Sequence, residues 1–136
     1  MISPGDLGIV VQQLVEDPTI LGLGDLYLRR TSSYPGHDGL LLEDRVGAIL
    51  YVVELQLGAT DDRHVIRVAE RWAQERKRHP RNQCFAVLVA EQITPRYLNI
   101  LRLITRAVPM VVMEMQMSEA AGIATLEFAR VGLRLR

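Results

Sequence analysis

The chain has 136 residues, of which 49% are hydrophobic and 24% are charged, and its formal net charge is zero. This composition is typical of a folded globular chain and excludes a disordered one. No apolar run is long enough for a transmembrane helix, the amino terminus lacks the pattern of a secretory signal, and a lone cysteine, Cys84, excludes an internal disulfide. We therefore expect a cytoplasmic protein with a single domain over residues 1–136. Zero net charge argues against tight, indiscriminate binding of nucleic acid.

The first half of the chain predicts one helix and a β-hairpin. The helix begins near Ser3, which can cap it, with Pro4 in its first turn, and it ends before Pro18. A short strand is expected over residues 27–30. Two apolar runs, residues 38–44 and 47–58, flank a polar turn and predict the hairpin. In the second run the period of two puts Val52, Glu54 and Gln56 on one face, and Val53, Leu55 and Leu57 on the other.

The second half alternates helices and strands. A helix is expected over residues 62–77, capped by Thr60 or Asp61, and the continuously apolar run 83–91 is typical of a central strand covered on both faces. A second capped helix begins at Thr94, and two strands follow over residues 109–117 and 123–136. This succession predicts an α/β fold with a central mixed β-sheet flanked by helices.

Two acidic residues of the predicted hairpin point to metal chemistry. Asp38 begins one strand and Glu54 lies near the end of its antiparallel neighbour, so we expect the two positions to face each other. Adjacent carboxylates repel unless a cation neutralises them. Mg²⁺ or Mn²⁺ would do so with oxygen ligands, to which the carbonyl of Leu55 would add, and would stabilise charge on a phosphodiester. The alternatives are that Asp38 is a turn residue and that Glu54 and Gln56 are a satisfied polar pair on a solvent-facing strand.

The helix after the hairpin is basic. From Arg63 to Arg81 there are seven Arg or Lys residues against two Glu. Arg67 and Arg71 share one face and can clamp a phosphate, and His64 lies one turn earlier, where it can contact phosphate or orient the site. The alternatives are ion pairing of the arginines on a wet helix face and a histidine at the surface without a role.

The hairpin and the basic helix together resemble the PD-(D/E)XK nuclease superfamily, which has the restriction-endonuclease-like fold. The likeness covers residues 16–116. It rests on Asp38, separated by 15 residues from Glu54, and on an E-x-Q-x-G-x-T-D-x-x-H stretch, residues 54–64, that prokaryotic members carry.

The resemblance implies a role for each motif position. Asp38 and Glu54 would be the metal-binding carboxylates, and Gln56 stands where the pattern more commonly has lysine. A glutamine supplies a dipole in place of the fixed positive charge of lysine, but its carbonyl oxygen can accept a hydrogen bond from water and its amide can donate to phosphate. Glu16, at the end of the first helix, best matches the remaining acidic position and would hold a metal-bound water; it is alternatively an ordinary helix terminus.

The favoured function is therefore a Mg²⁺-dependent nuclease that hydrolyses phosphodiester bonds in DNA, with RNA as the less favoured substrate. Asp38, Glu54 and Gln56 would be its catalytic residues. The alternative is a catalytically inactive module of the same fold that binds nucleic acid or assembles with protein. The apolar last strands are compatible with a homodimer in either case, and no membrane partner is expected.

Overall fold

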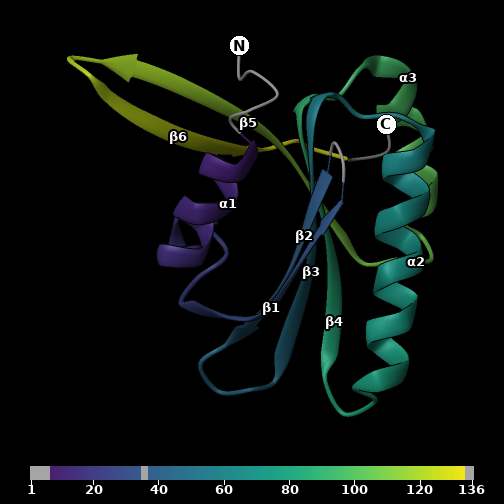
Figure 1. Cartoon of the computed structure of the whole chain (residues 1–136). Helices are drawn as coiled ribbons and strands as arrows, with labels where there is room; N and C mark the ends of the chain where they lie inside the picture. Colours follow the sequence, from purple (N-terminus) through teal and green to yellow (C-terminus); the bar gives the residue numbers. More distant parts are fainter. Residues whose placement is uncertain (1–6, 35–36, 134–136) are drawn as a thin grey trace.

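The core of the molecule is a six-stranded mixed β-sheet. The computed structural model describes residues 7–34 and 37–133. The strands are β1 (Leu26–Tyr34), β2 (His37–Asp44), β3 (Ile49–Ala59), β4 (Gln83–Gln92), β5 (Met110–Ala120) and β6 (Ile123–Arg130). They lie in the order β1 to β6; β3–β4 and β4–β5 are parallel, and the other pairs are antiparallel (Figure 1). The predicted hairpin of β2 and β3 is thereby confirmed.

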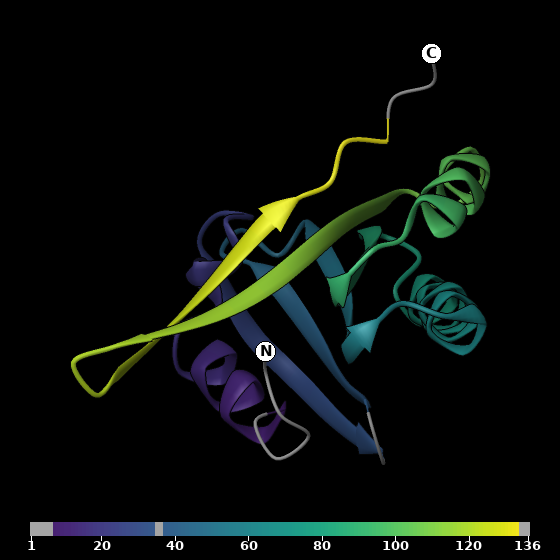
Figure 2. The same ribbon diagram turned by 90° about the horizontal axis from the view of Figure 1, so that it is seen from above.

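Helices cover both faces of this sheet. They are α1 (Leu7–Glu16), the 3₁₀ helix η2 (Pro18–Leu21), α2 (Asp62–Arg78) and α3 (Pro95–Ile104). The sheet curls, with α1 on its inner side and α2 and α3 on its outer side (Figures 1 and 2). The predicted cap at Ser3 and Pro4 lies outside the described residues. No helix in the ranges above is long and apolar enough to cross a membrane.

Local sequence explains where these elements begin and turn. Asp61 caps α2, because its carboxylate accepts a hydrogen bond from the backbone N–H of His64 at 2.9 Å. Asp44 closes the β2–β3 turn by accepting from the N–H groups of Ala48 and Ile49 at 2.8 and 3.1 Å. The last hairpin turns at Ala121 and Gly122, both with positive φ, as in the tight turns that suit the twist of paired strands.

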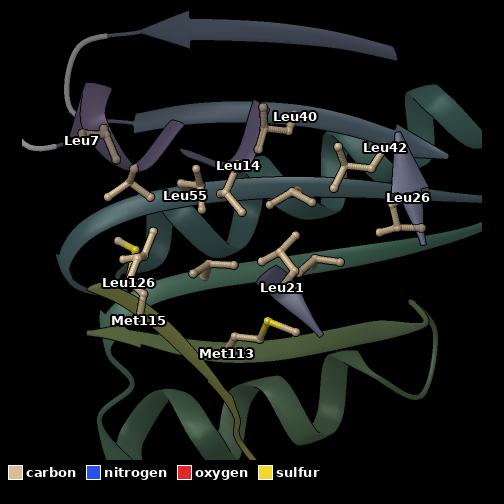
Figure 3. Packing of buried hydrophobic residues seen from close by; sticks show 14 residues of the cluster. Leu7, Leu14, Leu21, Leu26, Leu40, Leu42, Leu55, Met113, Met115 and Leu126 are labelled. Carbon is tan, nitrogen blue, oxygen red and sulfur yellow. The ribbon is translucent and has the colours of Figure 1, made fainter. Parts of the chain in front are cut away.

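Apolar side chains form a core on each side of the sheet. The inner core holds α1, η2 and four side chains of β3, those of Tyr51, Val53, Leu55 and Leu57. Met113, Met115 and Leu126 from the last hairpin complete it (Figure 3). The outer core holds α2, α3 and the side chains of Leu50 and Val52. The alternation predicted for β3 is therefore confirmed. β4 is buried on both faces, which also matches the prediction from its continuous apolar run.

The first strand differs from its prediction in length and in shape. β1 runs from Leu26 to Tyr34 rather than over residues 27–30 alone, and its pairing with β2 shifts between Leu28 and Arg30. This bulge at Arg29 changes which residues face each side of the sheet. Leu26 joins the inner core, whereas Arg30 pairs with Leu41, a residue of the outer core.

Candidate functional site

Glu54 is the most deeply buried charged group in the described chain. It lies in β3 on the side covered by α2, and its exposed fraction is 0%. Two arginines of α2, one helical turn apart, extend to it. The Nε atom of Arg71 is 3.0 Å from one carboxylate oxygen, and the Nε atom of Arg67 is 3.7 Å from the other. We refer to Glu54, Gln56, Arg67 and Arg71 as the Glu54 cluster.

Burial and ion pairing shift the pKa of Glu54 in opposite directions. Burial raises the pKa of this carboxyl above its usual range, and the guanidinium groups of Arg71 and Arg67 offset the shift only in part. The protonated form is thus favoured more than it would be in water. The two arginines offset part of the free-energy cost of burying a carboxylate in the fold.

Gln56 fixes the orientation of Arg67. Its side-chain amide donates to the carbonyl of Ala59 at 2.9 Å, and its side-chain oxygen accepts from Nη2 of Arg67 at 3.1 Å. The amide therefore has a structural partner on each side. The prediction that Glu54 and Gln56 share a face is confirmed, and the arginines of α2 cover that face.

His64 supports the cluster from inside the fold. Its exposed fraction is 0%, Nε2 lies 3.0 Å from the carbonyl of Glu54, and Nδ1 lies 2.8 Å from the hydroxyl of Thr60. Because a carbonyl only accepts, Nε2 carries a proton, and in the neutral ring Nδ1 then accepts from the hydroxyl of Thr60. The prediction that His64 contacts phosphate is therefore wrong, since a buried ring with both nitrogens engaged cannot reach a ligand at the surface.

A glycine makes room for the Arg71 guanidinium. Gly39 lies directly opposite Glu54 in the β2–β3 pair, and a Cβ atom there would collide with the guanidinium. Arg71 also donates to the hydroxyl of Ser32 on β1. The space across from Glu54 is therefore occupied by arginine, and Ser32 is a member of this site that the sequence interpretation missed.

Asp38 lies on the other side of the sheet from Glu54. It pairs with Leu55, an inner-core residue, and cross-strand partners point to the same face. The prediction that Asp38 and Glu54 face each other is wrong by one residue of register, which reverses the side of the sheet. Asp38 is buried, and its Oδ1 atom has no hydrogen-bond partner among the described residues. Glu16 is exposed at the end of α1, and α1 packs on the inner side of the sheet, away from Glu54.

These positions decide whether the predicted donors fit a divalent ion. A Mg²⁺ or Mn²⁺ ion needs several oxygen ligands converging on one point. Within residues 7–34 and 37–133, no group of three acidic, histidine or cysteine side chains is arranged to hold a metal. Asp38 and Glu16 are separated from Glu54 by the sheet, and Glu54 is engaged by two arginines. The predicted donor set, including the carbonyl of Leu55, therefore does not fit the ion.

The fold has a known counterpart. The structure is similar to that of EndoMS in a complex with double-stranded DNA, with a TM-score of 0.58, 16% sequence identity, and coverage of 84% of this chain. The match covers 46% of the EndoMS chain, so this chain spans less than half of that protein. The likeness confirms the predicted fold class, an α/β fold with a central mixed sheet flanked by helices. No protein-family model and no curated protein matches the sequence.

Proposed function

We propose that this chain is a nuclease-fold module that binds nucleic acid, most readily DNA, through the arginine-rich side of α2 without a catalytic metal. The observation that carries the proposal is the arrangement around Glu54. Two guanidinium groups neutralise one carboxylate, so the cluster has an excess of positive charge. Guanidinium groups bind phosphate with paired, charge-assisted hydrogen bonds.

Two further observations support this proposal. EndoMS, which shares the fold, was captured with double-stranded DNA. Gln56 stands where the PD-(D/E)XK pattern more commonly has lysine, and its side-chain oxygen and amide are both engaged by protein groups. A residue engaged in this way is suited to hold Arg67 in place and is poorly suited to activate a water molecule.

The Mg²⁺-dependent nuclease of the sequence analysis is the second candidate. The buried Oδ1 atom of Asp38, which has no hydrogen-bond partner in the described ranges, favours it, because such an atom has the chemistry of a metal ligand. This candidate requires Arg71 to leave Glu54 and the start of β2 to change its side of the sheet. We likewise propose that the chain belongs to the PD-(D/E)XK superfamily, is located in the cytoplasm and forms a homodimer.

One pair of assays separates the two candidates. Binding of a fluorescently labelled DNA duplex is measured by anisotropy in the presence of a chelator and again with Mg²⁺ or Mn²⁺. Cleavage of the same duplex is followed in parallel for the wild type, Asp38→Ala and Glu54→Ala. The binding module predicts the same affinity with and without metal, and no cleavage.

The contrary result is equally specific. Cleavage by the wild type that needs a divalent ion and is lost in both variants would establish the nuclease and overturn the first proposal. Absence of binding to duplex and single-stranded DNA and RNA, with folding verified by circular dichroism, would overturn both nucleic-acid proposals.

A further inference from the structure

The bulge in β1 builds one wall of a groove beside the Glu54 cluster. Without the bulge at Arg29, strand alternation would place Arg30 on the inner side with Leu26 and Leu28. The extra residue reverses the alternation, so Arg30 pairs with Leu41 and Ser32 pairs with Gly39. Both side chains therefore face α2.

Arg30 completes a second arginine–glutamate arrangement near the carboxyl end of α2. Glu75 has an exposed fraction of only 2%, and it forms ion pairs with Arg30 from β1 and with Arg78, the latter at 2.9 Å. His79 lies 3.4 Å from the other carboxylate oxygen of Glu75. As at Glu54, one buried carboxylate is flanked by two arginines, which leaves an excess positive charge.

The two arrangements line the same groove between β1 and α2. The groove has a volume of about 440 Å³ and is lined by Arg30, Ser32, Arg67, Glu70, Arg71, Gln74, Glu75 and Arg78. Arg67 and Arg71 form its deeper part, with side chains 20% and 16% exposed, whereas Arg30 and Arg78 are about half exposed at its mouth. The four arginines carry more positive charge than the negative charge of Glu70, Glu75 and the underlying Glu54 carboxylate. The groove therefore has a net positive charge.

We infer that this groove, which we call the β1–α2 groove, holds the sugar-phosphate backbone of one nucleic-acid strand. The inference rests on the proposed function and goes beyond it by naming the contact surface and the residues Arg30, Ser32 and Arg78. The buried carboxylates hold the arginines in fixed positions before a ligand arrives, which reduces the entropy lost on binding. The contacts are to phosphate, so they position a strand without reading its sequence.

The dimensions of α2 suit a polyanion better than a single anion. Arg67 and Arg78 lie 11 residues apart on the helix, a rise of about 16 Å at roughly 1.5 Å per residue. One strand of B-DNA carries a phosphate about every 3.4 Å along the duplex axis. The arginines at the two ends of the groove would therefore contact phosphates several nucleotides apart on the same strand.

The test compares two arginines of the same helix. Arg78 lines the groove, whereas Arg76 lies over the ring of Trp72 and lines a different cavity. DNA affinity is measured over a range of salt concentrations for the wild type, Arg78→Ala, Arg30→Ala and the control Arg76→Ala. Loss of one phosphate contact reduces the slope of log K against log salt by about 0.9 for a duplex. We expect this reduction, with about tenfold weaker binding at low salt, for Arg78→Ala and Arg30→Ala but not for Arg76→Ala.

A third variant changes the groove without changing its charge. In Gly39→Ala the added Cβ displaces the Arg71 guanidinium, and we expect weaker DNA binding at an unchanged net charge. Thermal melting of each variant identifies any that fail to fold. Two results would overturn the assignment of the strand to this groove and leave the proposed function intact. In the first, the wild type binds DNA and Arg76→Ala weakens binding as much as Arg78→Ala does. In the second, the wild type binds DNA and none of Arg30→Ala, Arg78→Ala and Gly39→Ala weakens binding. Absence of wild-type binding would instead overturn the proposed function.

Discussion

Replacement of Arg71 by methionine tests the electrostatics of the Glu54 cluster. Methionine keeps an unbranched side chain that reaches about as far as the Nε atom of arginine, and it removes the charge. In the wild type the Nε atom of Arg71 lies 3.0 Å from Glu54, where at an effective dielectric constant of about 20 the attraction between unit charges is about 5.5 kcal/mol. Part of this attraction is offset by the desolvation of Arg71 in the fold. We therefore expect Arg71→Met to lower the free energy of unfolding by about 3–5 kcal/mol at neutral pH.

The loss of stability in Arg71→Met must depend on pH. Because burial raises the pKa of Glu54, this residue contributes stability that is fully present below its unfolded pKa and is lost as pH rises through the folded pKa. Removal of Arg71 raises the folded pKa further, since Arg71 opposes the shift in the wild type. The difference between wild type and variant is therefore small in acid, where Glu54 is protonated in both. It widens as pH rises past the folded pKa of the wild type.

Urea denaturation at a series of pH values measures this difference directly. Arg76→Met is the matched control, because it removes the same charge from the same helix outside the cluster. It should change the free energy of unfolding by no more than about 1 kcal/mol, as expected for an exposed charge. A deficit in Arg71→Met that does not vary with pH, or an equal deficit in Arg76→Met, would show that Glu54 and Arg71 do not interact as described.

Two other predictions address different parts of the fold. Hydrogen bonds from the Tyr27 hydroxyl and from Arg29 lower the pKa of Glu43, and together they outweigh the opposing effect of burial. Glu43 therefore contributes stability above its unfolded pKa, and this contribution is lost as pH falls through the folded pKa. Glu43→Gln should therefore cost about 1.5–3 kcal/mol at neutral pH, and urea denaturation should show this cost disappearing in acid; a constant cost would refute the assignment. His64→Leu should cost about 2–5 kcal/mol at neutral pH, because it leaves two buried groups without their partner; a change below about 1 kcal/mol in the urea midpoint analysis would contradict the buried position of the ring.

Much of the fold follows from patterns that are local in the sequence. The alternation through β3, the continuous apolar run of β4 and the cap at Asp61 each predict an element that the structure contains. Their order along the chain is enough to predict a mixed sheet covered by helices, because parallel neighbours require a crossover. These features depend on neighbouring residues and not on distant ones.

The register between β2 and β3 could not be predicted from local sequence patterns. The side of the sheet on which Asp38 lies depends on how many residues the turn consumes, and Asp44 fixes that number by hydrogen bonding to Ala48 and Ile49. An error of one residue moves a side chain to the opposite face. The bulge at Arg29 is similar, because nothing in the sequence around it marks an unpaired residue.

The burial of His64 and Glu75 could have been predicted from their helical spacing, which the sequence analysis did not use. His64, Val68, Trp72 and Glu75 recur at spacings of four, four and three, which is the period of one helix face. Polar residues on a buried stripe must find partners. The spacing therefore indicates that both residues are buried, although it does not show that their partners are Thr60 and Arg30.

The central claim is that Arg67 and Arg71, and not a metal ion, neutralise the Glu54 carboxylate. A crystal soaked in Mn²⁺ tests this claim most directly. The anomalous difference map reports the ion independently of any model of the side chains. We predict the guanidinium of Arg71 against the Glu54 carboxylate and no Mn²⁺ peak within coordination distance of Glu54. A strong peak bound by Glu54 and Asp38 together, with Arg71 displaced, would contradict the account and favour the metal-dependent nuclease.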